Sequence, residues 1–309
     1  MNKAIHIQEA VTPEEVERFW QELHAYHARD IFPDPAEEDR AYFLDDSQYR
    51  AAIQRIHDRE GDRCYYLLFR REGRDIGFAL TALYPSEDGK CFVMEFCVLP
   101  EFRGGGTGTA FARLLLDWAA DRGAQYGELN AADPRRIRFW SHLGFRPNGR
   151  DEWGEPLMLR PPEQALSITV ELLQDPADWQ LRKLENGYLA EIGEPLLTEE
   201  STERLRAAVE QGHIRFLLAY RGCRAVGMCS VAENFSTFCC GPAAVLEDLY
   251  VEPVFRRQGI ARQLTRSAQA LCRERGVGSL AVCCAPCDEA MYQALGFNVP
   301  LGVSRSCLL

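Results

Sequence analysis

Two short stretches decide how this chain folds, EFRGGGTGTAF at residues 101–111 and VFRRQGIARQL at residues 254–264. The first holds four glycines within the five positions 104–108. Each stretch follows an apolar run and leads into a helical pattern of apolar residues, which indicates a strand, a tight turn and a helix. The first N–H groups of a helix have no partner within it, and the helix dipole favours anions there. Both turns are therefore suited to hold a phosphate.

The two stretches are copies within a longer repeat. Arg103 and Arg256 stand 153 positions apart, and the same spacing joins Glu95 to Asp248, Pro100 to Pro253, Gly106 to Gly259 and Gly123 to Gly276. Two further blocks repeat in the same order, residues 67–78 with 217–228 and residues 139–145 with 291–297. Three blocks in one order indicate a tandem duplication. The proline pair in RPPEQALS, residues 160–167, places the boundary near Glu163, with domains at 1–163 and 164–309.

Each half begins with a helix-start signal. Thr12, Pro13 and Glu15 read as an N-cap, a proline in the first turn and a capping-box acid. Asp175 and Pro176 predict the same cap in the second half. The helix after each glycine turn is expected to end at an Arg-Gly pair, residues 122–123 and 275–276, because glycine readily takes the left-handed cap conformation.

The elements between these helices predict the α/β class with a mixed sheet in each half. A polar helix is expected at residues 47–59 and again at 200–210. Two strands joined by a turn follow in each half, and then the strand that enters the glycine turn.

Composition narrows the class of protein. The chain has 309 residues, of which 46% are hydrophobic, and its net charge is −11. That acidity disfavours nucleic acid as a partner and suits a cationic small molecule. No apolar run approaches the roughly 18 residues of a membrane span, and no secretory signal is visible. We therefore expect a cytoplasmic protein with no membrane or nucleic-acid partner.

Cysteine is abundant, with twelve residues, nine of them after position 220. They include the pairs Cys239-Cys240 and Cys283-Cys284, and Cys284 with Cys287 forms a C-x-x-C. A zinc site needs a second such pair or a histidine pair at ligand spacing, which the sequence lacks. We therefore expect buried, reduced thiols and no metal.

The two turns differ from the common nucleotide motifs. The dinucleotide fingerprint needs a small residue where Phe111 stands, and neither turn has the lysine of a P-loop. What both share is Arg-x-x-Gly-x-Gly/Ala. With this pattern the sequence resembles the GNAT superfamily of N-acetyltransferases over nearly all of both halves. The strongest local match is VLEDLYVEPVFRRQGIARQL at residues 245–264, together with AMYQALGF at residues 290–297.

The resemblance implies two tandem GNAT-like domains, each a mixed, mostly antiparallel sheet flanked by helices. It implies acetyl-CoA as donor, with its pyrophosphate on the backbone amides of the turn and its pantetheine arm on the preceding strand. By position these roles fall in the first half to Phe96, Val98, Arg103, Gly104, Gly105, Gly106, Thr107 and Gly108. In the second half they fall to Leu249, Val251, Arg256, Arg257, Gln258, Gly259, Ile260 and Ala261.

Acetyl transfer to an amine also needs a base for the amine and a proton for the departing thiolate. The resemblance places the acid on Tyr292, whereas the first half has Trp140 there, and an indole cannot yield a proton near neutral pH. It places the base at Glu247, with Asp248 as the alternate. These two should face opposite sides of a regular strand. Glu95 matches Asp248 and could act as base in the first half.

Three interpretations remain open. In the first, the C-terminal half transfers acetyl to a primary amine by direct attack in a ternary complex, and the N-terminal half is a degenerate copy that may still bind CoA. In the second, catalysis belongs to the N-terminal half. In the third, the protein is a non-catalytic sensor of acetyl-CoA or acyl-CoA. The acceptor is expected to be a small cationic amine. The chain is expected to be a monomer with its halves across a pseudo-twofold axis, or a homodimer. No role is assigned to His24, His27 or His142.

Overall fold

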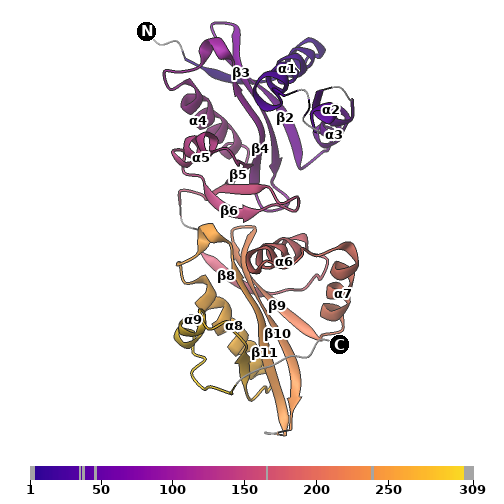
Figure 1. Cartoon of the computed structure of the whole chain (residues 1–309), viewed down its shortest axis with the longest axis vertical. Coiled ribbons are helices and arrows are strands. Elements are labelled where there is room, and N and C mark those ends of the chain that lie inside the picture. The colour runs from indigo at the N-terminus through magenta and orange to yellow at the C-terminus, as the bar shows by residue number, and fades with distance from the viewer. Residues whose placement is uncertain are drawn as a thin grey trace. The chain divides into compact units, whose positions relative to one another are not determined.

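The computed structural model describes residues 4–34, 36, 39–44, 47–164, 166–237 and 240–302. The chain divides into two compact units, one made of residues 1–148 and 155–164, the other of residues 149–154 and 165–309. Each unit has its own sheet with helices on both faces (Figure 1). None of the described helices is long and apolar enough to cross a membrane.

The first unit is built on a seven-stranded sheet in the order β1-β2-β3-β4-β5-β7-β6. Strands β1 to β4 pair with one another in antiparallel fashion, whereas β4 and β5 are parallel. In Figure 1, helices α1 to α3 lie on one face of this sheet, and α4 and α5 lie on the other. The elements are β1 (His6–Glu9), α1 (Pro13–Tyr26), a π-helix (His27–Ile31), α2 (Arg40–Leu44), α3 (Ser47–His57), β2 (Arg63–Arg71), β3 (Arg74–Tyr84), β4 (Lys90–Val98), a 3-10 turn (Pro100–Phe102), α4 (Thr107–Ala120), β5 (Tyr126–Asn130), α5 (Pro134–Ser141), β6 (Arg146–Arg150) and β7 (Pro156–Arg160).

The second unit repeats this plan on a five-stranded sheet in the order β12-β11-β10-β9-β8. Its one parallel pair among the described strands is β11 with β12. The elements are β8 (Ile168–Leu172), α6 (Trp179–Ile192), α7 (Glu199–Glu210), β9 (Ile214–Arg221), β10 (Arg224–Ser236), β11 (Gly241–Val251), a 3-10 turn (Pro253–Phe255), α8 (Ile260–Glu274), β12 (Leu280–Val282) and α9 (Glu289–Ala294). The predicted α/β class with two mixed, mostly antiparallel sheets is confirmed.

The helix after each turn packs closely on the sheet at a strand glycine. Phe111 of α4 stacks on Phe69 of β2 with ring centroids 4.2 Å apart. A Cβ added to Gly77 of β3 would lie 2.2 Å from the Phe111 side chain. The matching Gly227 of β10 would place its Cβ 2.8 Å from a backbone oxygen of β11. Only glycine fits at these two positions, which explains why a glycine recurs in the repeated block of residues 67–78 and 217–228.

The predicted helix starts were right in one half and wrong in the other. The Thr12 side chain accepts from the Glu15 N–H and Glu15 closes the capping box of α1. Helix α6, however, is capped by Asp178, which accepts from the Gln180 N–H. The expected cap, Asp175, instead accepts from the N–H of Ala177 and closes a separate turn before the helix. Both predicted glycine ends are confirmed, since Gly123 and Gly276 have φ values of 91° and 72°.

A buried ion pair stabilises the second unit where β11 ends. Arg224 of β10 is 1% exposed and makes two hydrogen bonds to Glu252, at 3.0 and 2.8 Å. Lys183 of α6 lies 3.3 Å from the same carboxylate. Burial opposes ionisation of Glu252, but Arg224 and Lys183 outweigh it and hold its pKa at about 2. The pair joins two strands and a helix next to the glycine turn.

We expect Glu252→Gln to destabilise the second unit by about 3 kcal/mol or more, because it removes the carboxylate charge that pairs with the buried Arg224 guanidinium. The carboxylate stabilises the fold fully above its ordinary pKa of 4.5 and loses this effect as the pH falls toward about 2. Urea unfolding should therefore show a difference between wild type and variant that shrinks below pH 4.5. The double variant Arg224→Met/Glu252→Leu should recover much of the loss. A double variant as unstable as Glu252→Gln would contradict this account.

Candidate functional site

The first glycine turn leaves open space at the start of α4. Gly104, Gly105 and Gly106 have φ values of 94°, 57° and 80°, and no atom lies within 4 Å of a Cβ added to any of them. Gly106 is the N-cap of α4. The Arg103 guanidinium donates to the backbone oxygen of Val98 at 2.9 Å and bonds to Asp30 at 2.5 Å. Arg103 thus fixes the turn against the end of β4 and the π-helix.

The second turn has the same frame with different residues. Gly259, the N-cap of α8, has φ 83°, and Arg256 donates to the Val251 oxygen at 2.8 Å and pairs with Glu191 of α6. Arg257 stands in the place of Gly104 and has φ 62°. For a residue with a side chain this left-handed conformation costs roughly 1–2 kcal/mol. The left-handed conformation is therefore kept at the first and third positions of the turn, whereas Gln258, in the place of Gly105, does not adopt it.

A strand with a free edge leads into each turn. Strand β4 pairs with β5 over Lys90 to Phe92, and β11 pairs with β12 over Ala244 to Leu246. Among the described residues, no pairing with β5 or β12 continues beyond this point toward the turn, so the N–H and C=O groups on that side can bond an extended ligand. Phe96 and Val98 lie on the first such segment, and Leu249 and Val251 lie on the second.

A β-bulge lies beside the carboxylate on the strand that enters each turn. In the second unit Glu247 and Asp248 both stand opposite Ser230, so the strand is not regular as expected. The Ser230 hydroxyl bonds the Asp248 carboxylate at 2.8 Å, whereas Glu247 is exposed. Burial raises the pKa of Asp248, and the Ser230 hydrogen bond partly offsets this. The first unit has a register shift at the same place, next to Glu95.

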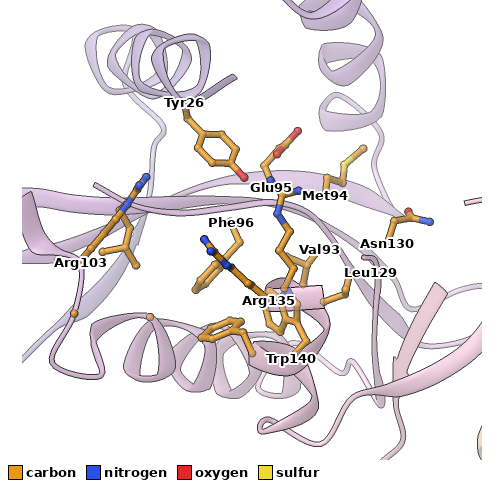
Figure 2. A pocket seen from close by; sticks show the side chains of 15 residues that line it. Tyr26, Val93, Met94, Glu95, Phe96, Arg103, Leu129, Asn130, Arg135 and Trp140 are labelled. Atoms are coloured by element: carbon orange, nitrogen blue, oxygen red, sulfur yellow. The ribbon is translucent and has the colours of Figure 1, made fainter. Parts of the chain in front are cut away.

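The opening between β4 and β5 is a pocket of about 400 Å³. Its lining includes Tyr26 from α1, Glu95 and Phe96 from β4, Asn130 from β5, and Arg135, Arg136 and Trp140 from α5. Figure 2 shows Tyr26 and Glu95 on one side of the strand, with Phe96 and Trp140 on the other. Gly104 and Gly108 of the turn also line the pocket, so the cradle and the carboxylate belong to one cavity.

Glu95 is held by a buried histidine. The Nε2 atom of His27 lies 2.8 Å from Oε1 of Glu95, and the Tyr49 hydroxyl lies 3.5 Å from the same oxygen. The side chain of His27 is 1% exposed and that of Glu95 is 14% exposed. No role was expected for His27. The sequence does carry a signal, because His27 stands one helical turn after Leu23 and continues the buried face of α1.

In the second unit Tyr292 and Asp248 lie within one cluster of ionisable groups. Burial, and then Tyr188, raises the pKa of Tyr292 to about 12, with Asp248 among the further contributors. Glu185 of α6 is buried, its Oε1 has no hydrogen-bond partner, and burial and Asp248 together raise its pKa to about 8. Neither Glu185 nor Tyr188 was expected at this site. Both follow Leu181 and Leu184 on the apolar face of α6, so the periodicity could have shown them.

Trp140 occupies in the first unit the place of Tyr292 in the second. It is 7% exposed and packs against Phe96, with ring centroids 5.2 Å apart, and against Phe145, at 5.1 Å. Tyr292 is only partly buried and contacts Phe297 edge-on at 5.8 Å. Trp140 is therefore a packing residue of the cleft wall, whereas Tyr292 keeps a hydroxyl that can donate.

The expectation of buried thiols was wrong for several cysteines of the second unit. Cys229 and Cys272 are buried, whereas Cys240, Cys283, Cys284 and Cys287 are exposed. The last three follow the short strand β12, which lies at the edge of the five-stranded sheet. Cys239 lies outside the described residues. Within the part of the chain that the structure describes, no group of His, Cys, Asp or Glu side chains is placed to hold a metal ion.

Comparison with known families finds the same match in both units. The sequence model of the acetyltransferase (GNAT) family matches residues 20–145 and again residues 179–297. Together the matches cover more than half of the chain, and the two copies predicted from the internal repeat are confirmed. A curated relative, the thialysine N-epsilon-acetyltransferase of Caenorhabditis elegans, is 34% identical over 77 residues. That alignment spans 25% of this chain and 48% of the relative, so the chain spans about half of the relative's length.

Solved structures resemble one half of the chain. An aminoglycoside acetyltransferase from an uncultured soil metagenomic sample, solved with sisomicin, has a TM-score of 0.41 at 19% identity and covers 46% of this chain and 95% of its own. An aminoglycoside N-acetyltransferase solved with CoA has a TM-score of 0.41 at 20% identity, over 47% of this chain and 97% of its own. A Trypanosoma brucei acetyltransferase has a TM-score of 0.39 at 19% identity, over 46% of this chain and all of its own.

The unpartnered Glu185 generates a prediction for stability. Its raised pKa means that the folded state keeps a proton which the unfolded state loses above pH 4.5, so stability falls as the pH rises from 4.5 toward 8. Glu185→Gln removes this dependence. We expect the variant to gain about 2 kcal/mol or more over wild type between pH 5 and pH 8 in urea unfolding. Exposed Glu247→Gln is the control, and equal pH profiles for all three proteins would contradict the assignment.

Proposed function

The chain belongs to the acetyltransferase (GNAT) family, and from this premise we propose that it moves an acetyl group from acetyl-CoA to a primary amine by direct attack in a ternary complex. One observation carries the proposal. In each unit a free strand edge, a left-handed glycine turn at a helix N-terminus and a partly buried carboxylate lie together. These parts supply what the reaction needs, which is a place for the donor and a base for the amine.

The residues present fit acetyl-CoA as donor, which supplies an activated acetyl thioester. The open space around Gly104, Gly105 and Gly106 lets the pyrophosphate approach the backbone N–H groups of the turn. Thr107 and Gly108 begin helix α4 behind them. Arg257, Gln258, Gly259, Ile260 and Ala261 make the corresponding turn in the second unit. Arg103 and Arg256 act by holding the turns, since their guanidinium groups bond backbone oxygens and carboxylates.

We place the main reaction centre in the second unit. Asp248, rather than the exposed Glu247, takes the proton of the incoming ammonium, because its carboxylate is the one that the bulge and Ser230 hold in the cluster. Tyr292 gives its proton to the departing thiolate. Burial raises the pKa of Tyr292 to about 12, so it remains protonated and able to donate. In the first unit Trp140 has no proton to give, and that unit binds CoA.

The acceptor of the second centre is a small cationic amine. The acidic groups that bear on Tyr188 are Asp248, Glu247 and Asp288, whereas Glu185 adds negative charge only above its pKa of about 8. A negative cleft attracts and orients an ammonium group. The curated relative is named for transfer to the Nε of thialysine, and solved neighbours are named for aminoglycosides, which are amines of the same general kind.

Donor binding can be assigned to each turn by calorimetry with acetyl-CoA. Gly106→Asp and Gly259→Asp place an anion in each cradle, and we expect each to weaken binding at its own unit at least tenfold. Asparagine at the same positions has nearly the same shape without the charge, and it also tolerates a left-handed backbone. Gly123→Asp and Gly276→Asp control for strain, since these glycines are left-handed and open but lie at the other helix ends.

The stoichiometry then shows which units bind the donor. Two sites in wild type and one in each Asp variant would support donor binding by both units. A single site lost in only one variant would name the unit that binds. No binding at all by wild type would overturn the proposed function.

Turnover distinguishes an enzyme from a sensor. We expect Tyr292→Phe and Asp248→Asn each to lower kcat at least a hundredfold for a diamine acceptor, because each removes one proton transfer. Tyr220→Phe is the matched control, since Tyr220 belongs to the same unit, has its pKa raised by burial to about 12, and bonds Asp178 at 3.4 Å instead. Release of free CoA thiol reports the rate. Wild-type binding without turnover would favour the sensor, and full activity of both variants would move catalysis to the first unit.

A further inference from the structure

The pocket of the first unit and the cluster of ionisable groups around Asp248 in the second unit differ in charge. In the first, Glu95 is joined by two arginines of α5, Arg135 and Arg136, which line the same pocket. In the second, the negative charges that act on Tyr188 near neutral pH are carboxylates of β11 and of the start of α9. A duplicated scaffold has thus been filled with different polar groups at the place where an acceptor would bind. Charge of this kind selects ligands by attraction and repulsion.

The first cleft also holds a prepared base. His27 donates from Nε2 to Oε1 of Glu95, and Tyr49 reaches the same oxygen, so Oε2 is the oxygen that can take a proton from the pocket. His27 begins the π-helix, in which Phe32 N–H bonds the His27 oxygen. Such turns occur often at functional sites. The same π-helix carries Asp30, which bonds Arg103 of the glycine turn, so one element positions both the base and the donor turn.

We propose that the first unit is a second acetyl-transfer centre, whose acceptor is an amine that also carries a carboxylate or another anionic group. Glu95 is its base, His27 positions Glu95, and Arg135 and Arg136 bind the anionic group. A carboxylate is well matched to guanidinium donors. This inference rests on the proposed function, since it requires the same donor and the same reaction.

The reaction balances without an acid from the protein. The acceptor enters as an ammonium with three protons and passes one to Glu95, which returns it to solvent. The neutral nitrogen attacks the thioester carbon, the C–N bond forms, and the C–S bond breaks. Of the two remaining protons, one passes to the departing sulfur and one stays on the amide. The presence of Trp140 where the second unit has Tyr292 is therefore compatible with turnover in the first unit.

The test uses two pairs of acceptors that differ by one carboxylate. The pairs are lysine with 1,5-diaminopentane and ornithine with 1,4-diaminobutane, assayed with acetyl-CoA on the full chain. The readout is the ratio of kcat/KM for the amino acid to that for its diamine. We expect Tyr292→Phe to raise this ratio at least tenfold and Glu95→Gln to lower it at least tenfold. No turnover of either amino acid by wild type, or a ratio unchanged by Glu95→Gln, would overturn the proposal.

The role of His27 has its own readout. Without the hydrogen bond from His27, the Glu95 carboxylate is no longer fixed toward the acceptor, so His27→Leu should lower kcat for lysine at least tenfold while the Kd for acetyl-CoA stays within twofold. His27→Gln can still donate to Glu95 and should restore kcat. These rates are measured in the Tyr292→Phe chain. A loss of acetyl-CoA binding that matches the loss of rate would show a structural role only and would overturn the positioning role.

The arginines could bind either a carboxylate of the acceptor or a phosphate of CoA. Arg135→Gln and Arg136→Gln separate these sources. We expect the KM for lysine to rise at least fivefold while the Kd for acetyl-CoA and the KM for 1,5-diaminopentane stay within twofold. A weaker Kd for acetyl-CoA with an unchanged lysine KM would assign them to CoA and overturn the acceptor class. Calorimetry also distinguishes failure of the proposed function from failure of this inference. If wild type does not bind acetyl-CoA, the proposed function itself is overturned. If it binds acetyl-CoA normally but the ratio of kcat/KM for amino acid and diamine does not change as expected, only this inference is overturned.

Discussion

The parting of two parallel strands just before a glycine turn is the constraint on which the rest of this structure depends. Strands β4 and β5 pair over only a few residues, and β11 and β12 do the same. A parallel pair that stops early leaves backbone donors and acceptors unpaired, and such groups need a ligand or water. The arginine of each turn bonds the last residue of the parted strand, Val98 or Val251, so the strand end and the helix start form one rigid frame. Because the carboxylates lie on the same strands, this frame fixes their positions relative to the turns.

The two units show how a duplicated fold can exchange packing partners without losing its shape. In the first unit, Tyr26 lies four residues before Asp30, the partner of Arg103. Its ring packs beside Phe78, near Cys97 of β4. Gly187 lies four residues before Glu191, the partner of Arg256, and a Cβ there would meet the Tyr250 hydroxyl at 2.7 Å. Tyr250 occupies the repeat position of Cys97. The aromatic ring has thus moved from the helix to the strand while the volume between them stays filled.

The same exchange changes the chemistry of each cleft. With the ring on the helix, the first unit presents a hydroxyl, Tyr26, to the pocket beside Glu95. With the ring on the strand, Tyr250 is buried, and the second unit presents Tyr188 and Asp248 in a field of carboxylates. Burial makes these charges strong, because water cannot screen them well. Small packing changes in the core are therefore coupled to the charge that an acceptor meets.

The sequence by itself determined the duplication, the fold class and the two turns, because those features are written in local patterns: spaced glycines, helical periodicity and caps. Gly77 and Gly227 recur because neighbouring atoms lie too close there for a side chain, so the same contact requires glycine in both copies of the repeat. Local pattern could not show that Asp178 rather than Asp175 caps α6, since both residues can cap a helix start. Only the tertiary structure decided which polar residues meet. His27 reaches Glu95 across 68 positions, Arg256 reaches Glu191 across 65, and beside a bulge Asp248 rather than Glu247 bonds the Ser230 hydroxyl. Such contacts depend on strand register and on how a helix packs against the sheet, and neither of these produces a periodic pattern in the sequence.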